Sequence, residues 1–187
     1  MRIIAGKYKS RRFEAKIPNG TRPTSDMARE SVFDILYSYM DFENINVIDI
    51  FAGTGAMGFE ALSRGAGYCL FVDKSIQSTN YIRNFAEKIG LEDVSFDTEK
   101  DDVVRSLRRM SRDSTEPFFE LAFLDPPYQS EILNTSLSLL AEGFILKPEG
   151  IAVVEHSVRM GINIPNKFDI LTQRTFGDTI IEIIKTK

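Results

Sequence analysis

The sequence contains one cysteine, one histidine and no tryptophan. A lone cysteine excludes an intramolecular disulfide, and one histidine with one cysteine excludes a zinc site built from those two residue types. No stretch longer than ten residues lacks a charged side chain, whereas a membrane-spanning helix needs about 20 mostly apolar residues. The first residues form neither an apolar signal core nor an Arg/Ser-rich presequence. We therefore expect a cytoplasmic globular protein, with no membrane partner and no metal.

Length and composition are those of one ordinary globular domain, with 187 residues, 43% hydrophobic and 27% charged. The charge is distributed unevenly along the chain. Residues 1–30 carry eight basic and three acidic side chains, a net charge of +5, and because the whole chain is at −4 the remainder is at −9. This pattern favours a basic extension that binds phosphates on an acidic body, although a merely solvated arm would have the same composition.

From residue 46 onward, strand-like and helix-like segments alternate. Strands are predicted at 46–51, 68–72, 93–96, 119–124 and 150–155, with helices near 56–64, 75–89, 100–110 and 130–141. Such alternation predicts an α/β fold with a doubly wound, mostly parallel sheet. The last two strands, at 168–175 and 179–185, are too close together for a helix, so we expect an antiparallel C-terminal hairpin. A further small hairpin is expected near the N-terminus, followed by a helix that begins near residues 24–26.

A glycine-rich turn follows the first of these strands, at Asp49-Ile50-Phe51-Ala52-Gly53-Thr54-Gly55-Ala56-Met57-Gly58. Glycines at such a turn let the backbone approach a ligand closely. Asp73 ends the second strand, where a carboxylate accepts hydrogen bonds from the hydroxyls of a ribose. Together these features predict a site for a nucleoside-containing cofactor. A phosphate-binding P-loop is excluded because no Gly-Lys-Ser/Thr follows.

The fourth strand runs directly into Asp125-Pro126-Pro127-Tyr128. The two prolines remove two amide donors, which leaves a carbonyl and a carboxylate as acceptors beside an aromatic ring. This trio suits a planar base that carries an amino group, since the acceptors hold both N–H bonds while the ring stacks on the base. Acceptors in this position favour the more nucleophilic amine of the transition state. We therefore predict that Asp125, Pro126 and Tyr128 are catalytic.

The glycine-rich turn and the Asp-Pro-Pro-Tyr segment together resemble S-adenosylmethionine-dependent amino-methyltransferases of nucleic acids. The resemblance is closest to the RsmD-type 16S ribosomal RNA guanine-N2 methyltransferases, with their Rossmann-like class I methyltransferase fold. It extends over nearly the whole chain and is carried by residues 2–7, 21–26, 29–30, Phe33, 60–66 and 176–179. On this resemblance, residues 1–24 are a basic hairpin extension and residues 25–187 the methyltransferase domain.

The resemblance implies roles for individual residues. The backbone at Ala52, Gly53 and Gly55 would lie against S-adenosylmethionine and Asp49 would hold its methionine end; relatives usually carry Glu where this chain has Asp73. Asp102, or its neighbour Asp101, would meet the adenine amino group. The residues implied to bind the base or RNA are Asp125, Pro126, Pro127, Tyr128, Arg11, Arg12, Arg22 and Arg29. Arg22 and Arg29 would either contact the RNA or order a loop over the cofactor.

The implied reaction is transfer of a methyl group to N2 of a guanine in 16S rRNA, at position 966 of the standard rRNA numbering. The base would be flipped out of its stack and presented by a 30S subunit or an assembly intermediate. No metal is required, S-adenosylhomocysteine is the product, and we expect a monomer. Recognition of an RNA already folded on ribosomal proteins would reconcile the acidic body with an RNA substrate.

Three other interpretations are open. An adenine-N6 methyltransferase acting on DNA or RNA uses the same Asp-Pro-Pro-Tyr chemistry, but such enzymes commonly carry a separate target-recognition domain, for which this chain has no room. A NAD-dependent dehydrogenase would share the glycine pattern but leaves the fourth-strand loop unexplained. A binding module without turnover is the third. His156 is expected at the surface or at a helix cap without a role, and Cys69 as a buried small hydrophobe.

Overall fold

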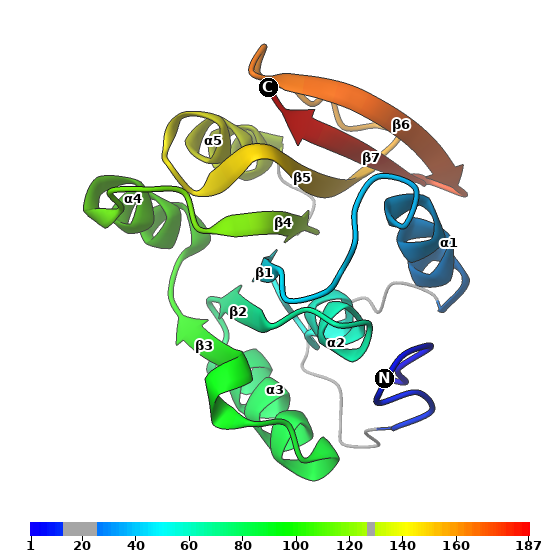
Figure 1. Cartoon of the computed structure of the whole chain (residues 1–187). Helices are drawn as coiled ribbons and strands as arrows, with labels where there is room; N and C mark the ends of the chain where they lie inside the picture. Colours follow the sequence, from blue (N-terminus) through cyan, green and yellow to red (C-terminus); the bar gives the residue numbers. More distant parts are fainter. Residues whose placement is uncertain (13–25, 127–129) are drawn as a thin grey trace.

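The protein is a three-layer α/β structure with one mixed sheet at its centre (Figure 1). A computed structural model describes residues 1–12, 26–126 and 130–187. Within these ranges the sheet has seven strands in the order β3-β2-β1-β4-β5-β7-β6. The strands are β1 (Asn46–Ile50), β2 (Tyr68–Asp73), β3 (Phe96–Lys100), β4 (Phe119–Leu124), β5 (Leu146–Ser157), β6 (Phe168–Phe176) and β7 (Thr179–Thr186). Strands β1 to β5 are parallel, while β7 runs antiparallel to both β5 and β6.

Helices cover both faces of the sheet (Figure 1). The helices are α1 (Asp26–Leu36), α2 (Ala56–Ser63), α3 (Ile76–Ile89), α4 (Val103–Asp113) and α5 (Ser130–Glu142), with a short 3-10 turn, η1, at Asp93–Ser95. Helices α1, α2 and α3 pack on one face in a cluster that contains Phe33, Phe59 and Phe85. Helices α4 and α5 pack on the other face around Leu107 and Leu137. Because both faces are covered, the central strands are apolar on both sides.

The predicted fold class is confirmed, including the antiparallel pair at the C-terminus. Three predicted boundaries were wrong. The third strand was expected at 93–96 and lies at Phe96–Lys100, because residues 93–95 form η1 and the strand itself is polar. The following helix was expected from residue 100 and begins at Val103, because the side chain of Asp102 accepts a hydrogen bond from Arg105 N and so caps the helix. Strand β5 also starts earlier than expected, at Leu146.

Residues 1–12 form turns and one antiparallel bridge, between Arg2 and Arg12, rather than regular strands. This segment is anchored to α2. Glu60 accepts hydrogen bonds from the backbone N–H groups of Ile4 and Ala5, at 2.8 and 3.0 Å. The rest of the predicted hairpin and the proposed domain boundary at residues 24 and 25 lie outside the described residues. The described part of the extension therefore packs on the body of the domain.

Candidate functional site

The predicted site residues follow neighbouring strands at one edge of the sheet. Asp49 lies in β1, Asp73 ends β2, Asp101 and Asp102 follow β3, and Asp125 follows β4. These strands are parallel, so their carboxyl ends meet at the same edge, and β1 lies between β2 and β4. The glycine-rich turn after β1 is thus flanked by Asp73 on one side and by Asp125 on the other. This is the edge at which open α/β sheets bind ligands.

The turn after β1 has a backbone that most side chains would not tolerate. Phe51, Gly53 and Gly55 have φ angles of 63°, 55° and 73°, in the left-handed region that favours glycine. A Cβ atom at Gly55 would lie 3.0 Å from each of Ile82, Phe59 and Phe71, so this position has no room for a larger residue. Gly55 is itself buried, so its missing side chain makes room for this packing, whereas Gly53 is partly exposed.

The amide groups of this turn are occupied within the protein. Ala52 N donates to Val72 O at 3.1 Å, Gly53 N donates to Asp73 Oδ2 at 2.8 Å and Gly55 N donates to Ala52 O at 2.6 Å. A phosphate cradle needs several backbone N–H groups that converge on the ligand, and these three are already satisfied. The turn suits a ligand that packs against backbone, which agrees with the absence of a P-loop motif.

Asp49 is buried beneath this turn, with 4% of its surface exposed. Its Oδ2 accepts a hydrogen bond from Gly58 N in the first turn of α2, at 2.9 Å. Burial raises the pKa of Asp49 to about 8; the Gly58 hydrogen bond opposes this shift, and the nearby carboxylate of Asp73 adds to it. A positive charge next to Asp49 would favour its ionised form.

Gly58 is the third glycine of the glycine-rich turn. A Cβ atom there would lie 2.3 Å from the Phe71 ring and 2.6 Å from Cys69 Sγ. Gly58 therefore allows α2 to pack closely on β2. Its backbone N–H, which reaches Asp49, fixes the start of the helix against β1. The buried position predicted for Cys69 is confirmed, with 0% of its surface exposed.

Asp73 ties the glycine-rich turn to the start of α3. Its Oδ2 accepts from Gly53 N and its Oδ1 from Ser75 N, each at 2.8 Å. An ionised carboxylate has about four acceptor positions, so each oxygen retains capacity for one more donor. Ile76, the first residue of α3, is 51% exposed despite its apolar side chain. No role was predicted for Ile76, which the sequence marks only as an apolar residue three positions after Asp73.

Asp101 and Asp102, which the sequence could not separate, have different environments. Asp101 is buried and its carboxylate pairs with Arg105 and, at 3.1 Å, with Arg109. The hydrogen bond from Arg105 lowers the pKa of Asp101. Asp102 is exposed, and its Oδ1 caps α4 by accepting from Arg105 N at 3.1 Å. Asp102 is therefore the more accessible carboxylate, while Asp101 is held in ion pairs.

The loop after β4 is described only in part. Asp125 is exposed and Pro126 is buried. Pro127 and Tyr128, the other members of the predicted base-binding segment, lie outside the described residues. Since Leu124 pairs with Ile50 of β1, the loop leaves the sheet beside the glycine-rich turn. The structure thus places Asp125 and Pro126 next to the predicted cofactor site.

The basic residues predicted to contact RNA divide into two groups. Arg11 and Arg12 are exposed, and Arg22 lies outside the described residues. Arg29 is only 2% exposed; it donates to Arg2 O at 2.7 Å and to Asp26 Oδ1 at 2.9 Å. Of the two roles predicted for Arg29, contact with RNA or ordering of a loop, this burial between the N-terminal segment and α1 favours the second.

His156 was expected at the surface or at a helix cap, and this expectation was also wrong. It lies in β5 with 7% of its surface exposed.

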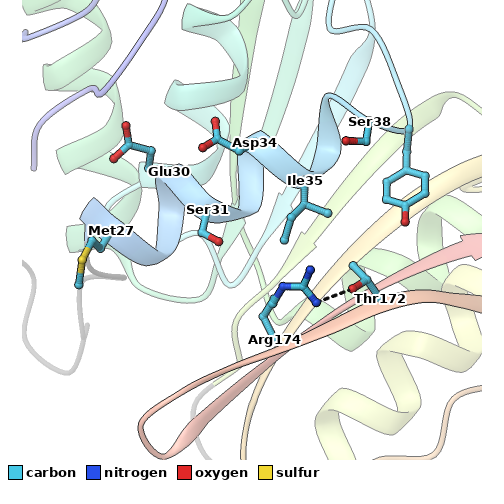
Figure 2. Close-up of a pocket in the computed structure, with 9 residues that line it drawn as sticks. Met27, Glu30, Ser31, Asp34, Ile35, Ser38, Thr172 and Arg174 are labelled. Carbon is cyan, nitrogen blue, oxygen red and sulfur yellow. Dashed lines mark hydrogen bonds between the residues drawn. The ribbon is translucent and has the colours of Figure 1, made fainter.

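A hollow of about 560 Å³ lies between α1 and β6. Met27, Glu30 and Asp34 line it on the helix side and Thr172 and Arg174 on the strand side (Figure 2). None of the predicted cofactor or base-binding residues that the structure describes contributes to it. Over residues 1–12, 26–126 and 130–187, no cluster of three or more His, Cys, Asp or Glu side chains is suited to a metal ion, and no helix is long and apolar enough to span a membrane.

Comparison with known proteins places this geometry in a family. The model of the family described as conserved hypothetical protein 95 matches residues 1–185. The protein YlbH of Bacillus subtilis, provisionally named an rRNA methyltransferase, is 32% identical over the full length of both chains. Ribosomal RNA small subunit methyltransferase D of Haemophilus influenzae is 31% identical over 95% of this chain and 89% of that protein.

Solved structures agree with the fold. A Haemophilus influenzae structure provisionally described as a methylase superposes with a TM-score of 0.80 at 27% identity, and covers 99% of this chain and 97% of that one. An Escherichia coli structure provisionally described as a methyltransferase has a TM-score of 0.85 at 22% identity, with coverage of 100% and 98%. At that identity the second comparison supports the fold alone.

Proposed function

Because the chain belongs to the conserved hypothetical protein 95 family, which is the family of the RsmD-type methyltransferases, we propose that it transfers a methyl group from S-adenosylmethionine to N2 of a guanine in 16S rRNA. Methylation of small-subunit rRNA is the activity for which these relatives are named. The observation that carries the assignment to this chain is the adjacency of three features at one sheet edge: the turn at residues 51–55, Asp73, and the Asp125-Pro126 segment.

The described residues fit such a cofactor. S-adenosylmethionine supplies a methyl group already activated on a positively charged sulfonium. Gly53 is partly exposed and carries no side chain, and Asp73 has acceptor capacity for ribose hydroxyls. The exposed Ile76 provides an apolar surface for an adenine ring, and Asp102 provides a carboxylate for its amino group. Burial raises the pKa of Asp49, and a cationic ligand beside it would lower that pKa and stabilise the carboxylate.

The base is held by the segment that follows β4. The Asp125 carboxylate and the Pro126 carbonyl accept the two N–H bonds of the guanine amino group, and Tyr128 stacks on the ring. An exocyclic amine is a poor nucleophile because its lone pair is delocalised into the ring. Acceptors that hold both hydrogens favour the pyramidal amine of the transition state, so Asp125 contributes by electrostatic stabilisation. In-line alignment of the amine with the methyl group supplies the rest of the rate enhancement.

The exposed basic side chains of the N-terminal segment contact the RNA backbone in this proposal. Lys7, Lys9, Arg11 and Arg12 are all exposed on a segment anchored to α2. An anchored basic segment presents its charges in a fixed position, which suits an RNA recognised by shape. We propose the small subunit or an assembly intermediate as substrate, a cytoplasmic location, and action as a monomer.

A methyl-transfer assay with labelled S-adenosylmethionine tests the proposal. The substrates are undermethylated 30S subunits, naked 16S rRNA and duplex DNA, and nucleoside analysis identifies the labelled base. Label in N2-methylguanosine from the 30S or rRNA sample supports the proposal. Label in N6-methyladenine would contradict the proposed substrate and still support the proposed site. Absence of label with the cofactor bound would indicate a binding module without methyl transfer.

The matched variants are Asp125→Ala and Asp93→Ala, which remove an exposed carboxylate at the proposed site and at the distant turn η1, respectively. Asp125→Ala should lower kcat by about 10²- to 10³-fold, as loss of one transition-state hydrogen-bond partner does, with cofactor affinity nearly unchanged. Asp93→Ala should leave both parameters unchanged. Equal effects of the two variants would contradict the assignment of Asp125.

A further inference from the structure

The hollow between α1 and β6 is lined by residues that the proposed reaction does not use. Its volume, about 560 Å³, lies within the range of ligand-binding pockets in proteins. The helix side carries two carboxylates, Glu30 and Asp34, and the strand side carries Thr172 and Arg174 (Figure 2). Because the three charged side chains are exposed, a partner can reach the hollow from solvent.

The two carboxylates of this hollow lack a compensating cation. Neither Glu30 nor Asp34 forms an ion pair with any residue that the structure describes. Arg29 of the same helix is buried and pairs with Asp26 at 2.9 Å. Like charges four residues apart on a helix are neighbours that repel each other. A cation bound between Glu30 and Asp34 would relieve this repulsion.

Arg174, the basic residue of the lining, is bound to its own strand. Its Nη1 donates to Thr172 Oγ1 and to Gln173 O, each at 2.9 Å. Figure 2 shows its guanidinium approaching α1 from β6, whereas Glu30 and Asp34 extend from the other side of the helix in this view. With two carboxylates and one guanidinium, the lining has a net charge of −1. The hollow therefore favours a cationic ligand.

Apolar surface flanks the carboxylates along α1. Met27 is 77% exposed and Tyr39 is 46% exposed, and both line the hollow. Lysine and arginine side chains pack their methylene stems on such surface while the charged end reaches a carboxylate. A cation is also attracted to the face of a tyrosine ring. The lining thus suits lysine or arginine side chains better than a bare inorganic cation.

The spacing of the carboxylates indicates the form of the ligand. Residues four apart on a helix have Cβ atoms about 5–6 Å apart. In an extended chain, side chains two residues apart lie on the same side, about 6.5 Å from each other. An extended segment with the pattern basic-x-basic therefore places one cation near Glu30 and one near Asp34. The hydroxyl groups of Ser31 and Ser38, which also line the hollow, offer hydrogen bonds to its backbone.

The hollow adjoins the sheet edge that carries the proposed site. Since β7 is antiparallel to both β5 and β6, β6 ends at the same edge as β5. Val158 N, after β5, donates to Asp178 O at 2.9 Å and so holds the β6–β7 turn at this edge. Arg174 lies three residues before Gly177 of that turn. A large substrate bound at the proposed site can therefore extend to the hollow.

The charge of this region favours a protein over RNA as the occupant. An RNA backbone carries a negative charge at every phosphate, which the two carboxylates would repel. Beyond residue 30 the chain has a net charge of −9, since the whole chain is at −4 and residues 1–30 are at +5. Such an acidic surface attracts basic proteins. Proteins that are bound to RNA carry basic segments because they neutralise phosphates.

We propose that the hollow between α1 and β6 binds an extended basic segment, with the pattern basic-x-basic, of a protein of the small ribosomal subunit, and that Glu30 and Asp34 are its ion-pair partners. This inference rests on the proposed function, in which the substrate is a particle of rRNA and protein. The contact adds affinity for the assembled particle over naked rRNA and leaves the reacting atoms untouched.

The first test measures binding of a blocked, fluorescent peptide, Thr-Lys-Thr-Lys-Thr-Lys-Thr, to the intact protein. The variant Glu30→Gln/Asp34→Asn removes both charges and retains the side-chain volumes. The matched control Glu92→Gln/Asp93→Asn removes two exposed carboxylates at η1, near β3 at the opposite end of the sheet. Exposed ion pairs are individually weak, so loss of both should weaken binding about three- to tenfold. The control should bind like the wild type.

NMR spectra locate the peptide on the protein. We expect the amide signals of Met27, Ser31 and Thr172 to shift as the peptide is added, and those of residues 92 and 93 to stay. The same peptide with glutamate in place of lysine should not bind. Equal affinity of the wild type and of Glu30→Gln/Asp34→Asn for the lysine peptide, or shifts confined to other parts of the surface, would overturn the proposal.

The second test uses the proposed substrate. Glu30→Gln/Asp34→Asn should raise the KM for 30S subunits about three- to tenfold, with kcat, cofactor affinity and the affinity for naked 16S rRNA unchanged. An unchanged KM for 30S subunits would refute the ribosomal partner, and an equal loss of affinity for naked rRNA would show that RNA occupies the hollow instead. If the wild type methylates no substrate, the proposed function fails, and the peptide titration still decides whether the hollow binds a basic segment.

Discussion

Glu60 is the residue whose replacement should affect stability most specifically. It is a fully buried carboxylate in α2, at 0% exposure. Its oxygens accept the backbone N–H groups of Ile4 and Ala5 at 2.8 and 3.0 Å, and the Nε atom of Arg64 at 2.9 Å. A second arginine is close as well: Arg29 Nε lies 3.7 Å from Glu60 Oε2. One carboxylate thus joins the N-terminal segment, α1 and α2.

The size of the effect follows from these contacts. Glu60→Ala would leave two buried cations without their common anion and two backbone N–H groups without acceptors. Loss of one partner of a buried ion pair costs about 3–5 kcal/mol, and each orphaned buried donor costs about 1–3 kcal/mol. Because part of this cost is relieved when residues 1–12 detach and become hydrated, we expect a net loss of about 3–5 kcal/mol in the free energy of unfolding.

Glu60→Gln separates the contribution of the charge to stability from that of the side-chain volume. The glutamine retains one acceptor oxygen and the same volume, so the packing of α2 is preserved. Its amide NH₂ group, however, faces the N–H donors whose hydrogen bonds Glu60 accepts. We expect about half the loss seen for Glu60→Ala, in line with a charge-assisted hydrogen bond worth about 1.5–3 kcal/mol. The control is Glu87→Gln, an exposed residue of α3, which should change the free energy of unfolding by less than about 0.5 kcal/mol.

Urea denaturation gives the free energy, and hydrogen exchange at the Ile4, Ala5 and Tyr8 amides shows whether the segment detaches. The Tyr8 amide donates to Ser63 Oγ at 3.0 Å, so it reports on the same interface without contacting Glu60. The KM for RNA should rise in the Glu60 variants while cofactor affinity is retained, because residues 1–12 carry Arg11 and Arg12. A stability loss below about 1 kcal/mol in Glu60→Ala, with unchanged exchange at all three amides, would refute the reasoning.

Three other outcomes are expected. The folded-state pKa of Asp49, about 8, is above its ordinary value of 3.8, so its contribution to stability is fully present below the ordinary value and is lost as the pH rises through 8; denaturation at several pH values should show that Asp49→Asn lacks this loss. Gly58→Ala should destabilise by about 1–3 kcal/mol, because the added Cβ would meet the Phe71 ring at 2.3 Å; calorimetry measures this, and an unchanged Tm would contradict it. The double substitution Arg11→Gln/Arg12→Gln should weaken RNA binding and reduce its salt dependence, with a slope change of about 2, while a loss independent of salt would indicate a folding defect.

The order and type of the elements were determined by the sequence. Alternating apolar strands and amphipathic helices require a parallel sheet covered on both faces, and the short connection at 177–178 requires an antiparallel final pair. The edge on which the site lies was equally predictable, because residues after parallel strands gather at one side. The turn after β1 could be recognised from its glycines, and Asp73 and Asp125 from their places at strand ends.

What only the tertiary structure decided concerns burial and partners between distant segments. Arg29 and Glu60 read as ordinary polar residues of amphipathic helices, yet both are buried, because residues 1–12 fold over them. Asp101 and Asp102 are indistinguishable by type and differ only in which one faces the arginines of α4. His156 meets Glu182 across two strands paired at long range. A local pattern specifies a helix face or a strand, whereas the group that lies opposite a charge is fixed by the packing of the whole chain.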